Sequence, residues 1–291
     1  MTAETDVTGG KPAHPDLEAR APDPPDDGRP AHPPGSGPTA PDLPDPDAYV
    51  RHIADLVRSI PVEQADPIKA AAALVARALD GGGVVQAFGS GHSEAVAMEI
   101  AGRAGGLVPT NRLALRDIVL YGGADRSELD RYDLERDPTV AHRILDAAPI
   151  ADGDLFVVIS SSGVNGVVVE LAAQVKERGH DLIAITSLAH SAAAPARHPS
   201  GRRLCDLADV VLDNRAPYGD AVLPLPGGGA VAAVSTITSA LLAQLVVIGA
   251  VAELLAAGQT PPVYLSANVP EGDAHNLALE ARYAGRIRRG G

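Results

Sequence analysis

Cysteine and aromatic side chains are scarce in this sequence. Cys205 is the single cysteine among 291 residues, so no disulfide can form within the chain. Trp is absent and aromatic residues make up 3% of the chain, which argues against a surface that stacks nucleotide bases or sugar rings. No charged-then-apolar leader opens the chain. A secreted, cross-linked scaffold is therefore excluded, and the expected compartment is the cytoplasm.

Basic residues are also in the minority. The 24 Lys and Arg stand against 37 Asp and Glu, and the net charge of −13 disfavours a nucleic-acid partner held through its phosphates. Residues 1–47 contain 12 of the 25 prolines, ten acidic residues, three Lys or Arg and no aromatic residue. Such a segment cannot bury enough apolar area to offset its ordering entropy. We expect a disordered tail at 1–47 and one folded domain at 48–291.

Apolar runs and helical periodicity alternate after the tail. Between residues 48 and 79 the apolar residues recur at helical spacing and are interrupted by Pro61 and Pro67, which predicts a helical lead-in. The later alternation predicts an α/β fold, with a parallel sheet covered by helices on both faces. The expected strands are 84–88, 155–159, 182–186 and 208–212, and the expected helices are 93–104, 165–178 and 235–257.

A long stretch without charge raises the question of a membrane span. The 32 residues between Asp220 and Glu253 carry no charged side chain, and a spanning helix needs roughly 20 apolar residues. Prolines and a run of three glycines break the first third of this stretch, and hydroxyl and amide side chains interrupt the rest. We therefore expect a helix that is buried in the domain or against a second subunit. The expected assembly is a homodimer or homotetramer, and no membrane partner is expected.

Two strand-to-helix turns carry the candidate chemistry. The first turn, residues 88–94, and the second turn, residues 159–166, each follow an expected buried strand. Helix N-termini there supply free N–H groups and a positive dipole end, so the turns favour an anion such as phosphate, although serines and glycines also cap helices in any α/β protein. The candidate binding residues are Gly89, Ser90, Gly91, Ser93, Ser160, Ser161, Ser162, Gly163 and Asn165.

Other phosphate-binding motifs are absent from the sequence. Glu94 stands where a dinucleotide fingerprint has its third glycine, and no Gly-x-x-x-x-Gly-Lys-Ser/Thr motif occurs. Nicotinamide binding and nucleotide hydrolysis are therefore disfavoured, and no cofactor is expected.

These turns resemble the two halves of a sugar isomerase (SIS) domain. Residues 84–106 carry its Gly-x-Gly-x-Ser turn, and residues 157–179 carry Ser-x-Ser-Gly-x-Asn after a strand. The span from Asp47 to Arg288 is similar to a little-characterised bacterial group of SIS-domain proteins. The resemblance implies a three-layer, flavodoxin-type fold with a five-stranded parallel sheet between helices. It also implies a phosphorylated sugar at the carboxyl ends of the strands, and a dimer or tetramer that shares its active sites.

The resemblance also assigns binding roles. The phosphate-binding serines of the superfamily correspond to Ser160 and Ser162, with Ser161 and Asn165 beside them, and the sugar-contacting serine corresponds to Ser93 or Ser90. The same fold serves isomerases, a sugar-acid etherase and sugar-phosphate sensors, so it leaves the activity open.

Glu99 is the candidate proton shuttle. It lies among apolar residues on the helix that begins near Ser93, and burial brings a carboxyl group closer to the range useful for proton transfer. The alternative is an ion pair with Arg103 on a solvated face. Similar heptose-phosphate isomerases have a zinc-binding histidine and a glutamate at the positions of Glu99 and Arg103. This difference in residue type disfavours an equivalent zinc site in this chain, and no metal is expected.

Two histidines are candidates for opening a sugar ring. His92 lies in the first turn, and His275 lies in a polar turn before a basic C-terminal helix. An imidazole titrates near neutral pH and can pass a proton between the ring oxygen and the anomeric hydroxyl. The leading hypothesis is an aldose–ketose isomerase that acts on a phosphorylated sugar or amino sugar. The alternatives are a non-catalytic sugar-phosphate sensor and a sugar-phosphate lyase or etherase.

Overall fold

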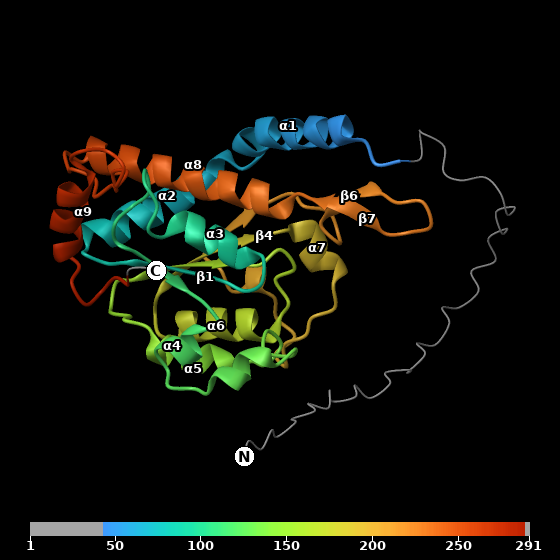
Figure 1. Ribbon diagram of the computed structural model, residues 1–291, viewed down its shortest axis with the longest axis horizontal. Helices are drawn as coiled ribbons and strands as arrows, with labels where there is room; N and C mark the ends of the chain where they lie inside the picture. Colours follow the sequence, from blue (N-terminus) through green and yellow to red (C-terminus); the bar gives the residue numbers. More distant parts are fainter. Residues whose placement is uncertain (1–42, 289–291) are drawn as a thin grey trace, which may run out of the picture. The chain divides into compact units, whose positions relative to one another are not determined.

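The chain folds as an α/β domain around one parallel sheet. A computed structural model describes residues 43–288, so most of the expected tail at 1–47 lies outside the described residues. The strands are β1 (Val85–Gly89), β2 (Thr110–Leu113), β3 (Leu155–Ile159), β4 (Asp181–Thr186) and β5 (Val210–Asp213). All neighbours pair in parallel, in the order β2-β1-β3-β4-β5 (Figure 1). The chain leaves β1 toward β2 and returns to the opposite side of β1 with β3, which places the switch of strand order between β1 and β3.

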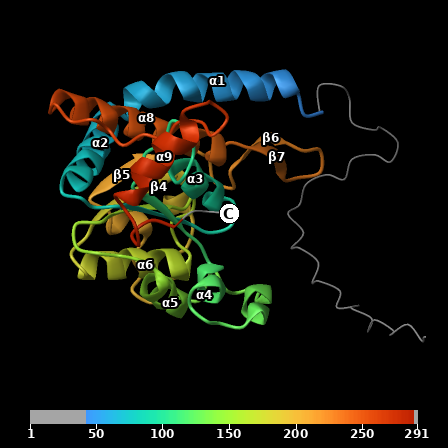
Figure 2. The same ribbon diagram turned by 60° about the vertical axis from the view of Figure 1, so that its left-hand side comes forward.

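Helices cover both faces of this sheet, as the alternating sequence predicts. One face packs against α2 (Ala65–Asp80), α3 (Ser93–Ile100) and α8 (Ser235–Ala256), and the other packs against α5 (Thr139–Ala147) and α6 (Gly166–Glu177) (Figures 1 and 2). The remaining helices are α1 (Pro46–Glu63), α4 (Asp117–Leu120), α7 (Leu188–Ala193), α9 (Gly272–Ala281) and the short 3-10 helices η2 (Arg126–Asp130) and η3 (Leu204–Asp206).

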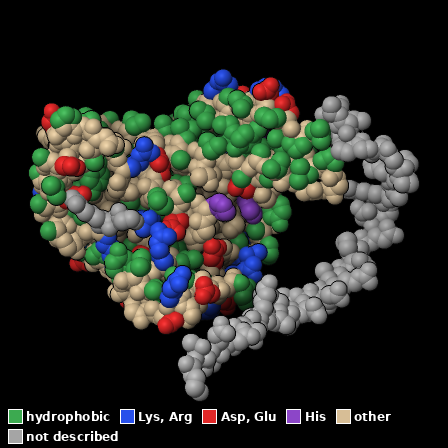
Figure 3. All heavy atoms as spheres, viewed as in Figure 1, with side chains coloured by type: hydrophobic (Ala, Val, Ile, Leu, Met, Phe, Trp, Pro, Cys, Tyr) green, Lys and Arg blue, Asp and Glu red, His purple; other side chains and the backbone are tan. Residues whose placement is uncertain are grey.

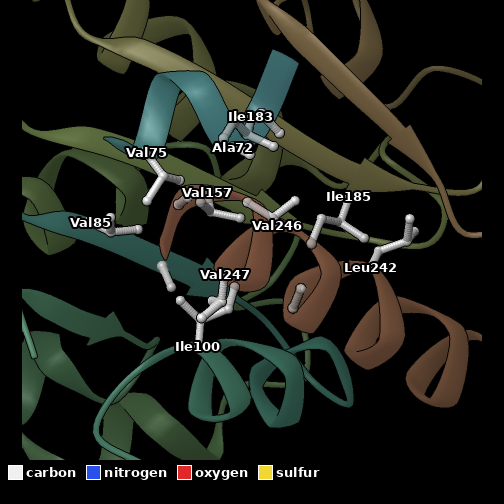
Figure 4. Packing of buried hydrophobic residues seen from close by; sticks show 14 of the residues in the cluster. Ala72, Val75, Val85, Ile100, Val157, Ile183, Ile185, Leu242, Val246 and Val247 are labelled. Atoms are coloured by element: carbon white, nitrogen blue, oxygen red, sulfur yellow. The ribbon is translucent and has the colours of Figure 1, made fainter. Parts of the chain in front are cut away.

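The alternation of side chains along the strands divides the core into two halves. Leu155, Val157 and Ile159 of β3 belong to the cluster shared with α2, α3 and α8, whereas Phe156 and Val158 belong to the cluster on the other face. This division follows from the two-residue period of a strand. Figure 4 shows the first cluster, in which strand side chains meet those of α2, α3 and α8. The five residues of β3 are all buried, as expected for a central strand covered on both faces.

Some elements differ from the sequence expectations. The edge strand β2 was not expected, because its Thr-Asn-Arg-Leu sequence is polar and short. The charge-free stretch begins with an antiparallel hairpin, β6 (Ala221–Pro224) and β7 (Ala230–Ala233), before α8. The lead-in is helical as predicted, but Pro61 lies inside α1 and Pro67 lies in the first turn of α2, so the two helices divide at Gln64 and not at a proline. α1 begins at Pro46, inside the segment assigned to the tail.

The start of α1 gives the first prediction. The Asp45 carboxylate accepts hydrogen bonds from the amides of Asp47 and Ala48 at 2.9 and 3.1 Å, and so caps the helix. A chain that begins at Asp45 should melt at the temperature of the full-length chain, because the composition of the removed residues offers no core. A chain that begins at Ala48 should melt a few degrees lower, since a lost cap costs about 0.5–2 kcal/mol.

Differential scanning calorimetry of both truncated chains measures this difference. Asp45→Asn in the full-length chain is the control, because asparagine also caps helices. A drop of several degrees for the chain that begins at Asp45 would instead show that the removed residues pack on the domain.

Candidate functional site

The two turns lie side by side at the switch of strand order. β1 and β3 are adjacent, and Gly89 at the end of β1 pairs with Ile159 at the end of β3. The turns that follow both strands therefore emerge next to each other at the carboxyl edge of the sheet. In open α/β sheets this crevice is where ligands bind. The two turns are neighbours because β1 and β3 are adjacent in the sheet, and the local sequence of either turn does not determine this.

The first turn is shaped by close backbone approach. A β-carbon at Gly89 would clash with the carbonyl group of Ser93, and Gly91 has a φ of +54°, in the left-handed region. The amide of Ser93 donates to the carbonyl of Ser90 at 3.1 Å, which closes the turn into α3. Ser90 and Ser93 are half-buried and His92 is exposed. The expected residues of the first turn are thus together at the start of α3.

The second turn has the features of an anion cradle. Ser160 is buried, and its Oγ accepts a hydrogen bond from the amide of Gly163 at 3.1 Å. Within residues 43–288, the amides of Ser162 and Val164 donate to no acceptor. The Oγ of Ser161 is buried and has no hydrogen-bond partner there. Unused donors on a turn that leads into a helix are what an anion requires.

A carboxylate that the sequence analysis did not single out lies between the two turns. Oε2 of Glu135 accepts a hydrogen bond from Nδ2 of Asn165 at 3.2 Å. Oε1 lies 3.0 Å from the position that a β-carbon on Gly91 would occupy. Oδ1 of Asn165 in turn accepts from Arg197 at 3.1 Å. These side chains border a pocket of about 300 Å³ lined also by Leu115, Leu129, Arg131, Tyr132, Leu134 and Arg136.

The segment that carries Glu135 is fixed against the start of α6. The carbonyl of Glu135 accepts a hydrogen bond from the amide of Val167 at 3.3 Å. A β-carbon at Gly166 would clash with the carbonyl oxygen of Arg136, so only glycine allows this approach. The signal available in the sequence was Gly166, a glycine at the first position of a helix, where its small size leaves room for another part of the backbone.

Ion pairs stiffen the same segment. Arg131 binds the carboxylates of Asp133 at 3.1 Å and Asp137 at 2.9 Å. The hydrogen bond from Arg131 lowers the pKa of Asp133, and the hydroxyl of Thr139, with Arg131, lowers the pKa of Asp137. Both carboxylates therefore stay charged near neutral pH and serve to hold the segment.

Glu99 makes the contact that the alternative interpretation foresaw. Its carboxylate pairs with Arg103 and also accepts a hydrogen bond from Nε2 of Gln244 on α8 at 2.7 Å. It lies near the end of α3, and the first turn lies at the start of that helix. A proton-shuttle role for Glu99 stays a prediction, and the observed ion pair favours a structural role.

The structure does not bring His275 to the two turns. His275 lies inside α9, and its Nε2 is 3.0 Å from the carbonyl oxygen of Val263. Val263 bridges Leu107, which precedes β2, so His275 lies toward the amino end of the sheet. Within one chain it is therefore remote from the carboxyl edge where the turns meet, and the expected polar turn at this residue is helical.

Two other histidines, His190 and His198, make contacts within the domain. His190 on α7 contacts the ring of Tyr218, and its buried Nδ1 has no partner among the described residues. His198 pairs with Glu170 at 2.8 Å.

A larger pocket of about 830 Å³ lies along the free edge of β2. It is bordered by the end of α3, by α9 and by Arg112, Asp117 and Arg288. Burial raises the pKa of Asp117, but its carboxylate also accepts a hydrogen bond from the Ala114 amide at 3.2 Å, and Arg288 lies 3.5 Å away. No residue of either turn lines this pocket. Among the described residues, no cluster of His, Cys, Asp or Glu could hold a metal ion.

Comparisons with known proteins identify the family of this chain. The family model for the SIS domain matches residues 48–187, which include both turns. UPF0309 protein lmo0025 of Listeria monocytogenes is 42% identical over 234 residues, covering 80% of this chain and 94% of that protein. A UPF0309 protein of Geobacillus thermodenitrificans is 36% identical over 242 residues, covering 83% and 96%. The solved structure of phosphoheptose isomerase GmhA from Neisseria gonorrhoeae is 21% identical, covers 69% of this chain and 94% of its own, and has a TM-score of 0.49.

This chain is thus a SIS-domain protein, as the two turns indicated. Within that class, the chain belongs to the UPF0309 family of bacterial proteins.

The close approach at Gly166 gives the second prediction. Gly166→Ala should displace the segment around Glu135 and destabilise the protein by about 1–3 kcal/mol, because the added methyl group has no room. Gly81→Ala is the control, since a β-carbon there meets its nearest atoms at ordinary contact distances of 3.5 and 3.6 Å. Thermal unfolding of both variants measures the difference, and equal melting temperatures would contradict this account of the segment.

Proposed function

We propose that this protein binds a phosphorylated sugar or amino sugar in the crevice between the two turns, in the cytoplasm. The observation that carries the proposal is the second turn, where the Ser162 and Val164 amides have no acceptor within the described chain and the Ser161 hydroxyl is buried without a partner. Membership of the SIS-domain class supports the same ligand. The phosphate would lie on the second turn, and the sugar would extend toward Ser90 and Ser93 of the first turn.

The donor set suits a phosphate in particular. The turn supplies backbone amides and hydroxyls, and a helix N-terminus adds a favourable dipole for a ligand that carries about two negative charges. Hydrogen bonds to a charged acceptor are roughly twice as strong as neutral ones. The phosphate would therefore supply most of the affinity, and the sugar would supply orientation.

An aldose–ketose isomerisation is the reaction we propose for the bound sugar. It needs a group to open the ring, a base to move a proton between adjacent carbons, and donors that stabilise an enediolate. His92 is exposed in the first turn, toward which the sugar would extend, and is the candidate for opening the ring. One observation favours the alternative of a non-catalytic sensor: the expected base, Glu99, is neutralised by Arg103. The isomerase proposal thus depends on another base.

The third prediction concerns Ser162. Ser162→Ala should weaken the binding of a sugar phosphate by at least tenfold with little change in melting temperature, because a hydrogen bond to a charged group contributes about 1.5–3 kcal/mol. Ser59→Ala on α1, outside both turns, is the control. Isothermal titration with fructose 6-phosphate, fructose, glucosamine 6-phosphate and inorganic phosphate makes the measurement. Equal affinity for fructose and its 6-phosphate would contradict a phosphate site at the second turn.

A second copy of the chain is the partner we propose for α1 and α8. Several apolar side chains on these neighbouring helices are exposed, including Val50 and Ile248 at 63% and Leu255 at 58%. Figure 3 shows hydrophobic side chains gathered over this part of the surface. α8 is long and apolar enough to cross a membrane, but Leu242 and Val246 hold one of its faces in the core. Insertion would unpack that core, whereas a second copy covers only the exposed face.

The fourth prediction is therefore a change of mass. Light scattering should give at least twice the chain mass of 29.7 kDa, and Ile248→Glu should shift the protein toward the single-chain mass. Leu120→Glu is the control, since Leu120 is similarly exposed but lies on α4, away from α1 and α8. A single-chain mass for the unaltered protein at micromolar concentration would rule out the dimer.

A further inference from the structure

Glu135 carries a carboxylate that is hydrogen-bonded to the second turn and lies beside Gly91 of the first turn, and no role has yet been assigned to it. We propose that Glu135 is a catalytic residue that moves a proton between adjacent carbon atoms of a sugar phosphate bound between the turns. This inference rests on the proposed binding of a sugar phosphate and names the base that the isomerase reaction requires.

Both oxygens of the Glu135 carboxylate are placed by the turns. Oε2 accepts the hydrogen bond from Nδ2 of Asn165, at the N-terminus of α6. Oε1 lies where any side chain on Gly91 would approach within 3.0 Å, so the glycine leaves that oxygen accessible from the first turn. The Arg197 contact to Oδ1 of Asn165 fixes the amide so that its NH₂ group faces Glu135. The carboxylate is therefore oriented before a ligand arrives.

The charge around Glu135 differs from that around the other carboxylates near the turns. Glu94 pairs with Arg116 at 2.5 Å, Glu99 pairs with Arg103, and Arg131 holds the two aspartates of the segment. Glu135 forms no ion pair with any cation in the described part of the chain. A guanidinium partner stabilises the charged form of a carboxylate and makes it a poorer proton acceptor. Asn165 orients Glu135 without neutralising it.

The pocket beside Glu135 has room for a ligand. Its volume of about 300 Å³ is at the lower end of the range for small-molecule sites. Asn165 belongs both to this pocket and to the second turn, so the pocket borders the turn that carries the proposed phosphate site. A sugar phosphate anchored on the second turn would thus present its carbon chain to Glu135.

The proton transfer balances without a cofactor or redox partner. Glu135 removes the proton from the carbon next to the carbonyl group, so the C–H bond breaks, an O–H bond forms on the carboxyl group, and an enediolate is left. The carboxyl proton exchanges with solvent while the enediolate is bound, the carboxyl group then delivers a solvent-derived proton to the former carbonyl carbon, and the proton of the neighbouring hydroxyl moves to the former carbonyl oxygen. The carbonyl group has then moved by one carbon, and the carboxylate is restored.

The fifth prediction tests this step by proton NMR in deuterium oxide. The probes are fructose 6-phosphate, glucosamine 6-phosphate, N-acetylglucosamine 6-phosphate and sedoheptulose 7-phosphate, each first tested for binding by calorimetry. The unaltered protein should exchange the carbon-bound proton next to the carbonyl group of a probe that binds. Glu135→Gln should keep the Asn165 hydrogen bond and bind that probe, but exchange should fall by at least a hundredfold, since general bases typically contribute 10²–10⁴-fold.

Matched variants separate the outcomes. Glu177→Gln, at an exposed position of α6, should leave exchange unchanged. Glu135→Asp keeps the charge but withdraws it by one methylene group, so it should slow exchange at least tenfold, and it replaces Glu135→Gln if that variant does not fold. Loss of exchange in Glu99→Gln with normal exchange in Glu135→Gln would overturn the assignment. A probe that binds without exchange in the unaltered protein would also overturn it, whereas failure of every probe to bind would reject the proposed ligand itself.

Discussion

The close passage of backbone over glycine is the constraint on which the candidate site depends. At Gly89 the chain turns so tightly into α3 that a β-carbon would meet the Ser93 carbonyl, and at Gly166 the start of α6 lies against the Arg136 carbonyl. The first contact sets the shape of the first turn. The second fixes a segment some thirty residues earlier in the chain against the second turn. Without both, Glu135 could not lie beside Gly91 and Asn165 at once.

Strand order supplies what these local contacts cannot. Each turn is a local feature, but the two become neighbours only because β1 and β3 are adjacent although β2 lies between them in sequence. The sequence predicted both turns, since each follows a buried apolar run and precedes a helical pattern. It predicted the covered parallel sheet for the same reason. It could not predict β2, whose Thr110, Asn111 and Arg112 lack an apolar pattern, because that strand pairs at one edge only.

The residues of the candidate site also divide into those set by local sequence and those set by long-range packing. The glycines and serines of the turns were predictable because their role depends on the backbone near them. The apolar neighbours of Glu99 on its helix predict a buried carboxylate, but its contacts with Arg103 and Gln244 depend partly on how α8 packs. The polar sequence around His275 predicts an accessible imidazole, yet the contact between Val263 and Leu107 places this residue toward the opposite end of the sheet. Glu135 stands in a charged segment like many surface loops, and only its passage over α6 distinguishes it.

The charge of Glu135 bears on the choice between sensor and enzyme. Two like unit charges about 8 Å apart repel by about 2 kcal/mol at an effective dielectric constant of about 20. An ionised carboxylate beside a phosphate cradle therefore weakens binding, and the arginines that line the pocket, Arg131, Arg136 and Arg197, form no ion pair with Glu135 in the described chain. A protein that only senses a sugar phosphate would bind more tightly with glutamine at this position. In an isomerase the same negative charge has a function, because a carboxylate without an ion-pair partner can take a proton from carbon.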